Sequence, residues 1–372
     1  MAPDWRDIRT GTCIPSEGYC DQPYVAVHTD GTWVCVMTTG AGHEGQGGQH
    51  VVSFRSTDCG ATWTDKADIE PASGPEASWA MPLALPDGRI YVFYTYNADN
   101  LRSVRDVNGA PIRRVDSLGD FAYRYSDDGG RTWSANRYRI PMRLFAIDRN
   151  NSEGGRVLFH WGVGKPFLHE GRAYVCYSKV GGFGDGFFVS DEGALLMSPN
   201  LMTERDPAKH VWETLPDGDC GITSPEGPIA EEWNVAPLSD GGLYGTYRTL
   251  AGYSGAATSH DGGRTWSAPS FMTNRPGGRP MKNPRAANFV RRLSNGKYIY
   301  WFHNHGGPIL GTHPRRTCLG YESRNPVWLC GGIEQNGSIV WSEPEIVLYD
   351  ANIGTRMSYP DFIERDGRFF IT

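Results

Sequence analysis

The sequence is poor in the features that mark helical, membrane-spanning and disordered proteins. Only 21% of the 372 residues are charged, and no run of about 18 apolar residues occurs. These shortages exclude a coiled coil, a disordered chain and a membrane-spanning helix. The formal net charge of −6 also argues against a nucleic-acid-binding protein, because such proteins need an excess of positive charge.

Cysteine is present, but in no metal-binding arrangement. None of the eight cysteines forms a Cys-x-x-Cys pair, which argues against a zinc ribbon. Cys13 with Cys20, and Cys318 with Cys330, are spaced for loop disulfides, while free buried thiols explain the same spacing equally well. The His-x-His motif at 303–305 lacks a third ligand at a recognisable spacing, so we predict neither a metal centre nor a cofactor.

Glycine, proline and aromatic residues are abundant instead. The chain has 47 Gly and 25 Pro, and 12% of its residues are aromatic. Turn-forming residues in such numbers, together with many aromatic side chains, are typical of short strands joined by tight turns. The composition therefore predicts an all-β protein.

One motif, Ser-x-Asp-x-Gly-x-Thr-Trp, occurs three times, at 56–63, 126–133 and 259–266. The Asp side chain can accept backbone N–H bonds across its own turn, and the Gly permits a positive φ. The Trp can fold back as an apolar cover between neighbouring sheets. We therefore interpret these boxes as structural and assign no catalysis to Asp58, Asp128 or Asp261.

A second repeat consists of two apolar runs joined by a turn of Asp, Glu or Asn followed by Gly, which is a strong hairpin signal. The turn glycines are Gly31, Gly88, Gly171, Gly241, Gly296 and Gly367. Their average spacing of about 67 residues predicts a β-propeller of four-stranded blades. We expect a single domain over 1–372 in which six blades begin and the last is incomplete at the C-terminal end, with an exposed strand edge.

This geometry predicts where a ligand would bind. The second strand of each blade should end at the channel mouth about seven residues after the hairpin glycine, on the face opposite the box turns. That offset yields a polar, aromatic and basic set: Thr38, Thr95 between Tyr94 and Tyr96, Ser178 beside Lys179, Arg248 and His303. Such a set suits a sugar that carries a carboxylate, although ordinary polar strand ends at a wet channel would look the same.

The segment 40–50 is expected to be a loop on the same face. It contains five Gly, two His, one Glu and two Gln, so it cannot build a core. His50 opens the third strand and is the best candidate for proton transfer near neutral pH. Gln49 and His43 are candidate substrate-binding residues in the same loop.

These boxes and offsets resemble the sialidase superfamily with its Asp-box, or BNR, repeats. The resemblance covers essentially the whole chain, and it implies a Glu nine residues before the fourth hairpin glycine and an Arg seven after it, which Glu232 and Arg248 match. It also implies a tyrosine nucleophile before the last hairpin, which Tyr359 matches with an offset one residue short. The superfamily's first arginine is missing, because that position reads Asp21-Gln22-Pro23, and its acid/base Asp is replaced by Gln49 or His50.

These departures look more like propellers that act on rhamnose-capped glucuronate, either rhamnosyl-glucuronate lyases or α-L-rhamnosidases. The segments 47–58, 94–100, 162–167 and 355–364 carry this narrower resemblance. It implies an acidic oligosaccharide or polysaccharide as partner. Such enzymes usually meet their glycan outside the cytoplasm, but the first residues resemble no export signal, so no compartment is predicted. A structural Ca²⁺ in the channel is left open.

Three mechanisms are compatible with these residues. In a lyase, His50 would act as base or acid, Arg248 would hold the uronate carboxylate with Lys179 or Arg285, and Tyr359 or a Tyr at 94–96 would donate a proton. In a hydrolase, which includes an exo-α-sialidase, Tyr359 would be the nucleophile, Glu232 its activator and His50 the acid. A non-catalytic glycan-binding propeller would keep the basic and aromatic rim without needing His50.

Overall fold

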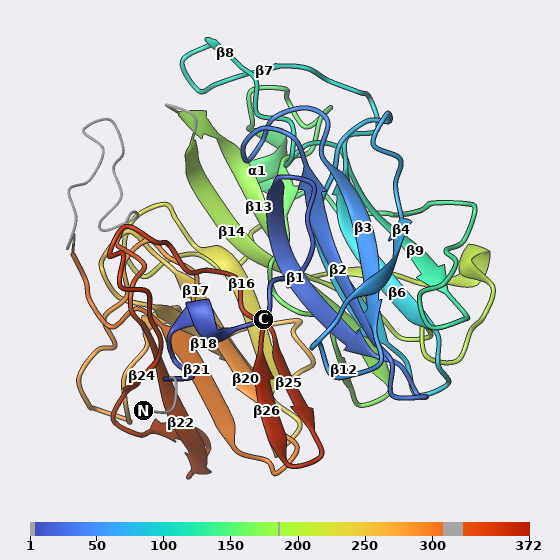
Figure 1. The fold of residues 1–372 in the computed structure, drawn as a ribbon. Coiled ribbons are helices and arrows are strands. Elements are labelled where there is room, and N and C mark those ends of the chain that lie inside the picture. The colour runs from blue at the N-terminus through green and yellow to red at the C-terminus, as the bar shows by residue number, and fades with distance from the viewer. Residues whose placement is uncertain (1–3, 185–186, 308–322) are drawn as a thin grey trace.

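The computed structural model describes residues 4–184, 187–307 and 323–372. Within these residues the fold is almost entirely β, with strands paired antiparallel to their neighbours in five sheets of four or five strands. Figure 1 shows the sheets around a common centre, which is the arrangement of a β-propeller. The predicted all-β propeller is confirmed.

Each sheet is one blade and follows chain order outward from the centre. Blade 1 contains β1 (Tyr19–Val27), β2 (Trp33–Gly40), β3 (His50–Ser56) and β4 (Thr64–Asp68). Blade 2 contains β5 (Ala77–Ala84), β6 (Ile90–Tyr96), β9 (Asp120–Ser126) and β10 (Tyr138–Ile140). Blade 3 contains β11 (His160–Trp161), β12 (Phe167–His169), β13 (Arg172–Gly184), β14 (Phe187–Ser198) and β15 (Glu213–Leu215).

The remaining blades follow the same pattern. Blade 4 contains β16 (Glu231–Pro237), β17 (Leu243–Arg248), β18 (Gly255–Ser259) and β19 (Ser270–Phe271). Blade 5 contains β20 (Phe289–Arg292), β21 (Tyr298–Phe302), β22 (Val327–Gln335), β23 (Ser338–Trp341) and β24 (Glu345–Leu348). Two small sheets are formed by β7 (Val104–Arg105) with β8 (Pro111–Ile112), and by β25 (Phe362–Arg365) with β26 (Arg368–Ile371). The described helices are short: η1 (Ile8–Thr10), α1 (Ala146–Arg149) and η2 (Pro207–Lys209).

The number of blades corrects the sequence prediction, since the structure has five blades and not six. The sixth hairpin forms only the two-stranded sheet β25–β26, whereas a blade needs four strands. This hairpin packs between blade 1 and blade 5 (Figure 1). Ile363 and Phe370 join the core cluster of Val25 and Trp33, and Phe362 packs edge-on against Trp301 of blade 5. That the domain is incomplete stays a prediction.

The two sequence repeats form the local structures expected of them. All six hairpin glycines have a positive φ. In each box the Ser hydroxyl and the Thr backbone N–H and hydroxyl hydrogen-bond to the Asp carboxylate, as in the Thr132 hydroxyl to Asp128 contact of 2.6 Å. Trp133 donates its indole N–H to Ser53 of blade 1 at 3.0 Å, so it links neighbouring blades. Whether the box turns lie on the face opposite the site stays a prediction.

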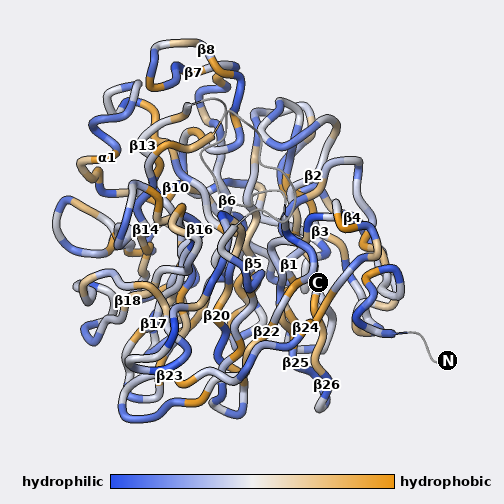
Figure 2. The backbone as a smooth tube through the Cα atoms, turned by 90° about the vertical axis from the view of Figure 1, so that its left-hand side faces the viewer, coloured by the Kyte–Doolittle hydropathy of each residue, from blue (hydrophilic) through white to orange (hydrophobic). Residues whose placement is uncertain are grey.

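The core lies between the blades and is rich in aromatic residues. Trp33, Trp79, Trp233 and Trp301 are among its largest fully buried side chains. In Figure 2, hydrophobic segments run along strands such as β20 and β24, whereas many connecting loops are hydrophilic. Within the described residues, no helix is long and apolar enough to cross a membrane.

The cysteines within the described residues are all free thiols. Cys13 and Cys20 therefore form no disulfide in this structure. The other proposed pair cannot be assessed in the same way, because Cys318 lies outside the described residues while its suggested partner Cys330 is a buried free thiol.

Candidate active site

A backbone irregularity recurs in the first strand of several blades, nine residues before the hairpin glycine. The register shifts there in β1, β5 and β16, and the residues at the shift, Gln22, Trp79 and Glu232, have a positive φ of 51°, 64° and 58°. Tyr359, just before β25, has the same conformation with a φ of 57°. A bulge of this kind re-aims a side chain away from the regular alternation of a strand. The repeat thus presents a set of special side chains near the centre of the propeller.

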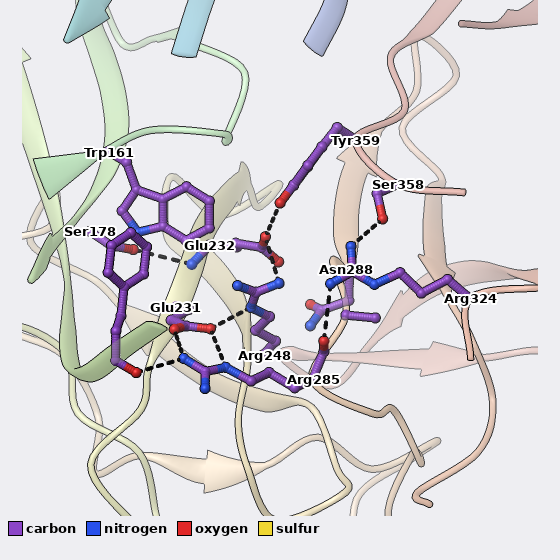
Figure 3. A network of polar contacts seen from close by, with 12 residues as sticks. Trp161, Ser178, Glu231, Glu232, Arg248, Arg285, Asn288, Arg324, Ser358 and Tyr359 are labelled. Carbon is purple, nitrogen blue, oxygen red and sulfur yellow. Dashed lines mark hydrogen bonds and ion pairs between the residues drawn. The ribbon is translucent and has the colours of Figure 1, made fainter. Parts of the chain in front are cut away.

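Two of these special residues meet. The Tyr359 hydroxyl donates a hydrogen bond of 2.8 Å to Oε1 of Glu232, and the same oxygen lies 2.9 Å from a guanidinium nitrogen of Arg248 (Figure 3). The Glu232 backbone N–H is held at 3.1 Å by the Ser178 hydroxyl of blade 3, and the Tyr359 ring packs edge-on against Trp79. Residues from blades 2, 3 and 4 and from the last hairpin therefore build one site.

Behind this pair lies a second carboxylate with two arginines. Glu231 accepts hydrogen bonds from Nε of Arg248 at 2.5 Å and from Nε of Arg285 at 3.0 Å, and Arg285 makes a further contact to its other oxygen. All three side chains are at most 3% exposed. Burial alone would raise the pKa of Glu231, but the two positive charges outweigh it and hold that pKa at about 2.

The pKa values of the two adjacent glutamates are thus shifted in opposite directions. Burial raises the pKa of Glu232 above its ordinary value, while the charges of Arg248 and Arg324 only partly oppose this. Burial and the nearby Glu232 carboxylate raise the pKa of Tyr359 well above its usual range. Tyr359 is therefore a protonated phenol at neutral pH, and Glu232 is a base of raised basicity that already accepts its proton in a hydrogen bond.

Arg324 belongs to the site, although the sequence did not point to it. Its guanidinium donates to the Ser358 hydroxyl at 2.6 Å and to the backbone oxygen of Arg285 at 3.3 Å (Figure 3). Its positive charge lowers the pKa values of Glu232 and Tyr359. Arg324 lies in the connection between β21 and β22, and such connections differ in length from blade to blade, so no repeat offset could have located it.

Asp21, Glu44 and Asp116 form a group of carboxylic acids that act electrostatically on one another. Asp21, which pairs with Thr38 across β1 and β2, accepts a hydrogen bond of 3.1 Å from the Tyr19 hydroxyl. Burial raises the pKa of Asp21 well above its ordinary value, and the negative charges of Glu44 and Asp116 raise it further. The Asp21 charge in turn raises the pKa of Tyr359, so the two groups lie within electrostatic reach. Asp21 occupies the position that the resemblance assigns to an arginine.

Several buried polar atoms in these strands have no hydrogen-bond partner among the described residues. They are Gln22 Oε1, Ser78 Oγ, Asp191 Oδ2, Glu232 Oε2 and both amide atoms of Asn288. Unpaired buried polar atoms are costly, and ordered water or a ligand can supply the missing bonds. The arrangement can therefore bind a hydroxylated ligand beside a poised tyrosine.

Several residues predicted for the site lie elsewhere. The ring nitrogens of His50 contact the backbone oxygen of Glu70 at 2.7 Å and the carboxylate of Glu17 at 2.8 Å, so both are occupied by the outer part of blade 1. Gln49 donates to the backbone oxygen of His43, whose side chain is exposed. The structure thus does not bring these three loop residues to the Tyr359–Glu232 pair.

The strand-end predictions divide in the same way. Arg248 and Arg285 are in the site, and buried His303 lies near Arg324, where burial lowers its pKa to about 3. Lys179 instead pairs with buried Asp148 at 2.6 Å. Tyr94 bonds Glu70, and Tyr96 carries the Arg137 guanidinium over its ring. These three side chains flank Thr95 and Ser178, and since successive side chains of a strand alternate between faces, they point into the packing between elements.

One cluster has ligand atoms spaced for a metal ion, outside the Tyr359 site. Glu17, His50 and Asp68 offer atoms within 4.8 Å of one another. However, the Lys66 ammonium contacts both carboxylates, at 2.7 Å in the case of Asp68. A cation is thus already supplied by the protein, and we assign no metal to this cluster.

Comparison with known protein families assigns this chain to one of them. Residues 76–371 match the family model described as BNR repeat-like domain. The chain belongs to the BNR repeat-like domain family. No curated protein matches the sequence. The boxes at 126–133 and 259–266 lie within the matched residues, and the box at 56–63 precedes them.

Solved structures show the fold of this BNR protein in other chains. The NanB sialidase of Streptococcus pneumoniae, as a K499G mutant, is 14% identical with a TM-score of 0.61, and the match covers 94% of this chain and 64% of that one. The intramolecular trans-sialidase of Ruminococcus gnavus is 14% identical with a TM-score of 0.58, over 97% and 90% of the two chains. An α-L-arabinanase of Penicillium chrysogenum is 13% identical with a TM-score of 0.50, over 90% and 86%.

At these identities the likeness concerns the fold, and the fold alone does not define the reaction. The chain also spans only 58% of the length of one matched protein, a Hadza microbial sialidase, and 64% of the pneumococcal enzyme. The activity of this BNR propeller must therefore be argued from its own site.

Proposed function

We propose that this protein is a retaining glycoside hydrolase in which Tyr359 is the nucleophile and Glu232 its general base. The observation that carries the proposal is the 2.8 Å hydrogen bond from the Tyr359 hydroxyl to Glu232. A neutral phenol is a weak nucleophile. A carboxylate that accepts a hydrogen bond from the phenol, and whose pKa is raised, can take the phenolic proton and so activate it. The neighbouring Arg248 and Arg324 stabilise the negative charge that develops on this pair.

The reaction has two steps. In the first, the Tyr359 oxygen bonds to the anomeric carbon, Glu232 takes the phenolic proton, and the glycosidic C–O bond breaks as an acid protonates the leaving oxygen. In the second, water attacks the anomeric carbon, the conjugate base of that acid takes the water proton, and the bond to Tyr359 breaks as Glu232 returns its proton. The anomeric configuration is inverted twice and so retained.

We assign the acid to Asp21 rather than to His50. Burial and the neighbouring Glu44 and Asp116 raise the pKa of Asp21 well above its ordinary value, which suits a group that donates a proton to a leaving oxygen. The ring nitrogens of His50 are both occupied by Glu70 and Glu17, which leaves neither for a substrate oxygen.

For the substrate we propose a terminal sugar on a uronate-containing glycan, as cleaved by α-L-rhamnosidases. The resemblance of segments 47–58 and 355–364 to propellers acting on rhamnose-capped glucuronate supports this. The same resemblance includes lyases, but the Tyr359–Glu232 pair favours hydrolysis, because elimination needs no nucleophile. A second candidate is an exo-α-sialidase, which is favoured by the arginines at 248 and 324 and by the fold, and disfavoured by Asp21.

The test combines variants with trapping of the intermediate. We expect Tyr359→Phe and Glu232→Gln to lose at least about 100-fold in kcat on the best substrate in a panel of aryl glycosides and arabinogalactan oligosaccharides. A 2-fluoro glycosyl fluoride of the preferred sugar should label the peptide that contains Tyr359, as measured by mass spectrometry. Tyr349→Phe, which alters a phenol bonded to Asp4 near the N-terminus, is the matched control and should keep full activity.

Three results would overturn the proposal. Full activity of Tyr359→Phe would remove the nucleophile, and the ultraviolet absorbance of an unsaturated uronate among the products would establish a lyase. Glycan binding without any product would leave the non-catalytic alternative.

A further inference from the structure

We propose that the sugar held against Tyr359 is electrically neutral, and that Glu231 is the residue that imposes this specificity. The inference rests on the proposed function, since it names the class of sugar that the same site accepts. On this view the uronate of the glycan lies on the leaving-group side of the bond that is cleaved.

The first support is that two arginines of the site, Arg248 and Arg285, are already paired with protein carboxylates. Glu231 contacts Arg248 and Arg285 at once, at 2.5 Å and 3.0 Å through their Nε atoms, and Glu232 contacts Arg248 again at 2.9 Å. These side chains are nearly inaccessible to solvent, so the protein carboxylates are not displaced by water. A sugar carboxylate would have to compete with Glu231 for the same guanidinium groups, and it would pay its own desolvation cost.

The second support is the balance of charge around Tyr359. Six carboxyl groups and four guanidinium groups interact with the Tyr359–Glu232 pair or with one another around it. The carboxyl groups are Asp21, Glu44, Asp116, Asp191, Glu231 and Glu232, and the guanidinium groups are those of Arg114, Arg248, Arg285 and Arg324. Those carboxyl groups that are ionised, above all Glu231, would repel a further negative charge strongly at short range in this buried site.

The third support is that the site contains neutral hydrogen-bonding groups and aromatic rings. Ser78 and Asn288 present buried polar atoms without a partner among the described residues, and these can bond sugar hydroxyls. Trp79 and Trp161 contact each other with ring centroids 4.9 Å apart, and Trp79 also packs against Tyr359. Neutral hydrogen-bonding groups beside aromatic rings are the means by which proteins hold an uncharged sugar.

The test compares anionic and neutral ligands on the intact chain. Wild-type protein is assayed with 4-methylumbelliferyl N-acetyl-α-neuraminide and with the neutral 4-methylumbelliferyl glycosides of L-rhamnose, L-fucose and D-galactose. We expect kcat/KM for the best neutral glycoside to exceed that for the sialoside by at least 100-fold. In Glu231→Gln, where the two arginines lose their common partner, this ratio should fall at least tenfold. Glu213→Gln, which breaks a surface ion pair with Arg264, is the matched control and should leave the ratio unchanged.

If no aryl glycoside is cleaved, a binding measurement tests the inference instead. The anionic probe is 2,3-didehydro-2-deoxy-N-acetylneuraminic acid, titrated by calorimetry, and it should bind Glu231→Gln at least tenfold more tightly than wild type. Wild type that prefers the sialoside, or binds this probe as tightly as Glu231→Gln does, would overturn the neutral-sugar inference. Sialoside hydrolysis that is lost in Tyr359→Phe would do so while leaving the proposed hydrolase intact, whereas unlabelled Tyr359 would remove the hydrolase itself.

Discussion

Neighbouring residues of one sequence can be given opposite acid–base properties by the backbone between them. Glu231 continues the regular pairing of β16 opposite Arg248, whereas Glu232 sits at the bulge and turns toward Tyr359. The first is therefore held ionised by two arginines, and the second is made more basic by burial. The position of each glutamate relative to the bulge therefore decides whether its side chain contacts the arginines alone or also reaches Tyr359.

Asp21 gives a prediction about stability and pH. Its pKa is raised in the folded protein by burial and by Glu44, so the folded state keeps a proton that the unfolded chain has already lost. The contribution of Asp21 to the free energy of unfolding is thus greatest at acid pH. It falls as pH rises from the ordinary pKa of the unfolded chain through the raised pKa of the folded protein. We expect Asp21→Asn to melt a few degrees above wild type at pH about 8 and equally at pH about 4, as measured by calorimetry, while glycosidase activity is lost. A lower melting temperature at both pH values would contradict this.

The element that organises the molecule is the blade with two distinct turns. The hairpin at its start needs a glycine with a positive φ, and the box turn at its end is held by an Asp that accepts several hydrogen bonds. Both depend on residues within eight positions of one another, which is why both were visible in the sequence. The bulge depends on pairing between strands, so the sequence showed only that Glu232 lies nine residues before the hairpin glycine.

Loss of one box should destabilise its blade measurably. Asp128→Ala removes the acceptor for the Ser126 hydroxyl at 2.7 Å and for the Thr132 backbone and hydroxyl at 2.9 Å and 2.6 Å. We expect a loss of about 1–2 kcal/mol in urea denaturation. Asp99→Ala, at an exposed loop position, is the matched control and should change stability by less than about 0.5 kcal/mol. Equal effects of the two variants would mean that the box is dispensable.

The whole molecule is held together where the last hairpin meets blades from earlier in the chain. Asp361, which is fully buried, accepts the backbone N–H of Val25 in blade 1 at 2.8 Å, pairs with Lys165 before β12, and accepts from Arg291 of blade 5 at 3.0 Å. A single carboxylate thus joins segments that are far apart in sequence. Because Tyr359 precedes Asp361 by two residues, the same junction positions the proposed nucleophile.

Removing this carboxylate should therefore affect both stability and the site. We expect Asp361→Ala to lose about 3–5 kcal/mol, since it leaves the Lys165 ammonium buried without its partner. Denaturation with urea measures the loss, and hydrogen exchange should rise in β25 and β26 before the rest of the chain. Glu364→Ala, whose exposed carboxylate bonds Ser294, should cost less than about 1 kcal/mol. An unchanged midpoint for Asp361→Ala would show that packing alone seats the hairpin.

The sequence by itself determined the all-β propeller, the six hairpins and the structural boxes, and it singled out Glu232, Arg248 and Tyr359, which the structure brings together. These follow from short-range rules or from fixed offsets within a repeat. The sequence placed His50, Lys179, Tyr94 and Tyr96 at strand ends but did not determine the direction of their side chains, and the structure shows these side chains in contacts with residues other than Tyr359 and Glu232. The count of blades also required the pairing of strands, because a hairpin in the sequence does not reveal whether two more strands join it.

Only the tertiary structure decided that Glu231 holds two arginines, that Arg324 enters the site, and that Asp21 lies within reach of Tyr359. These groups come from different blades and from loops of unequal length, so no local pattern links them. Their charges also act on one another through a buried region where water does not screen them, and the sign of each pKa shift depends on which neighbours are near. The sequence specifies the residue types, but their pKa values are set only when folding brings six carboxyl groups and four guanidinium groups together.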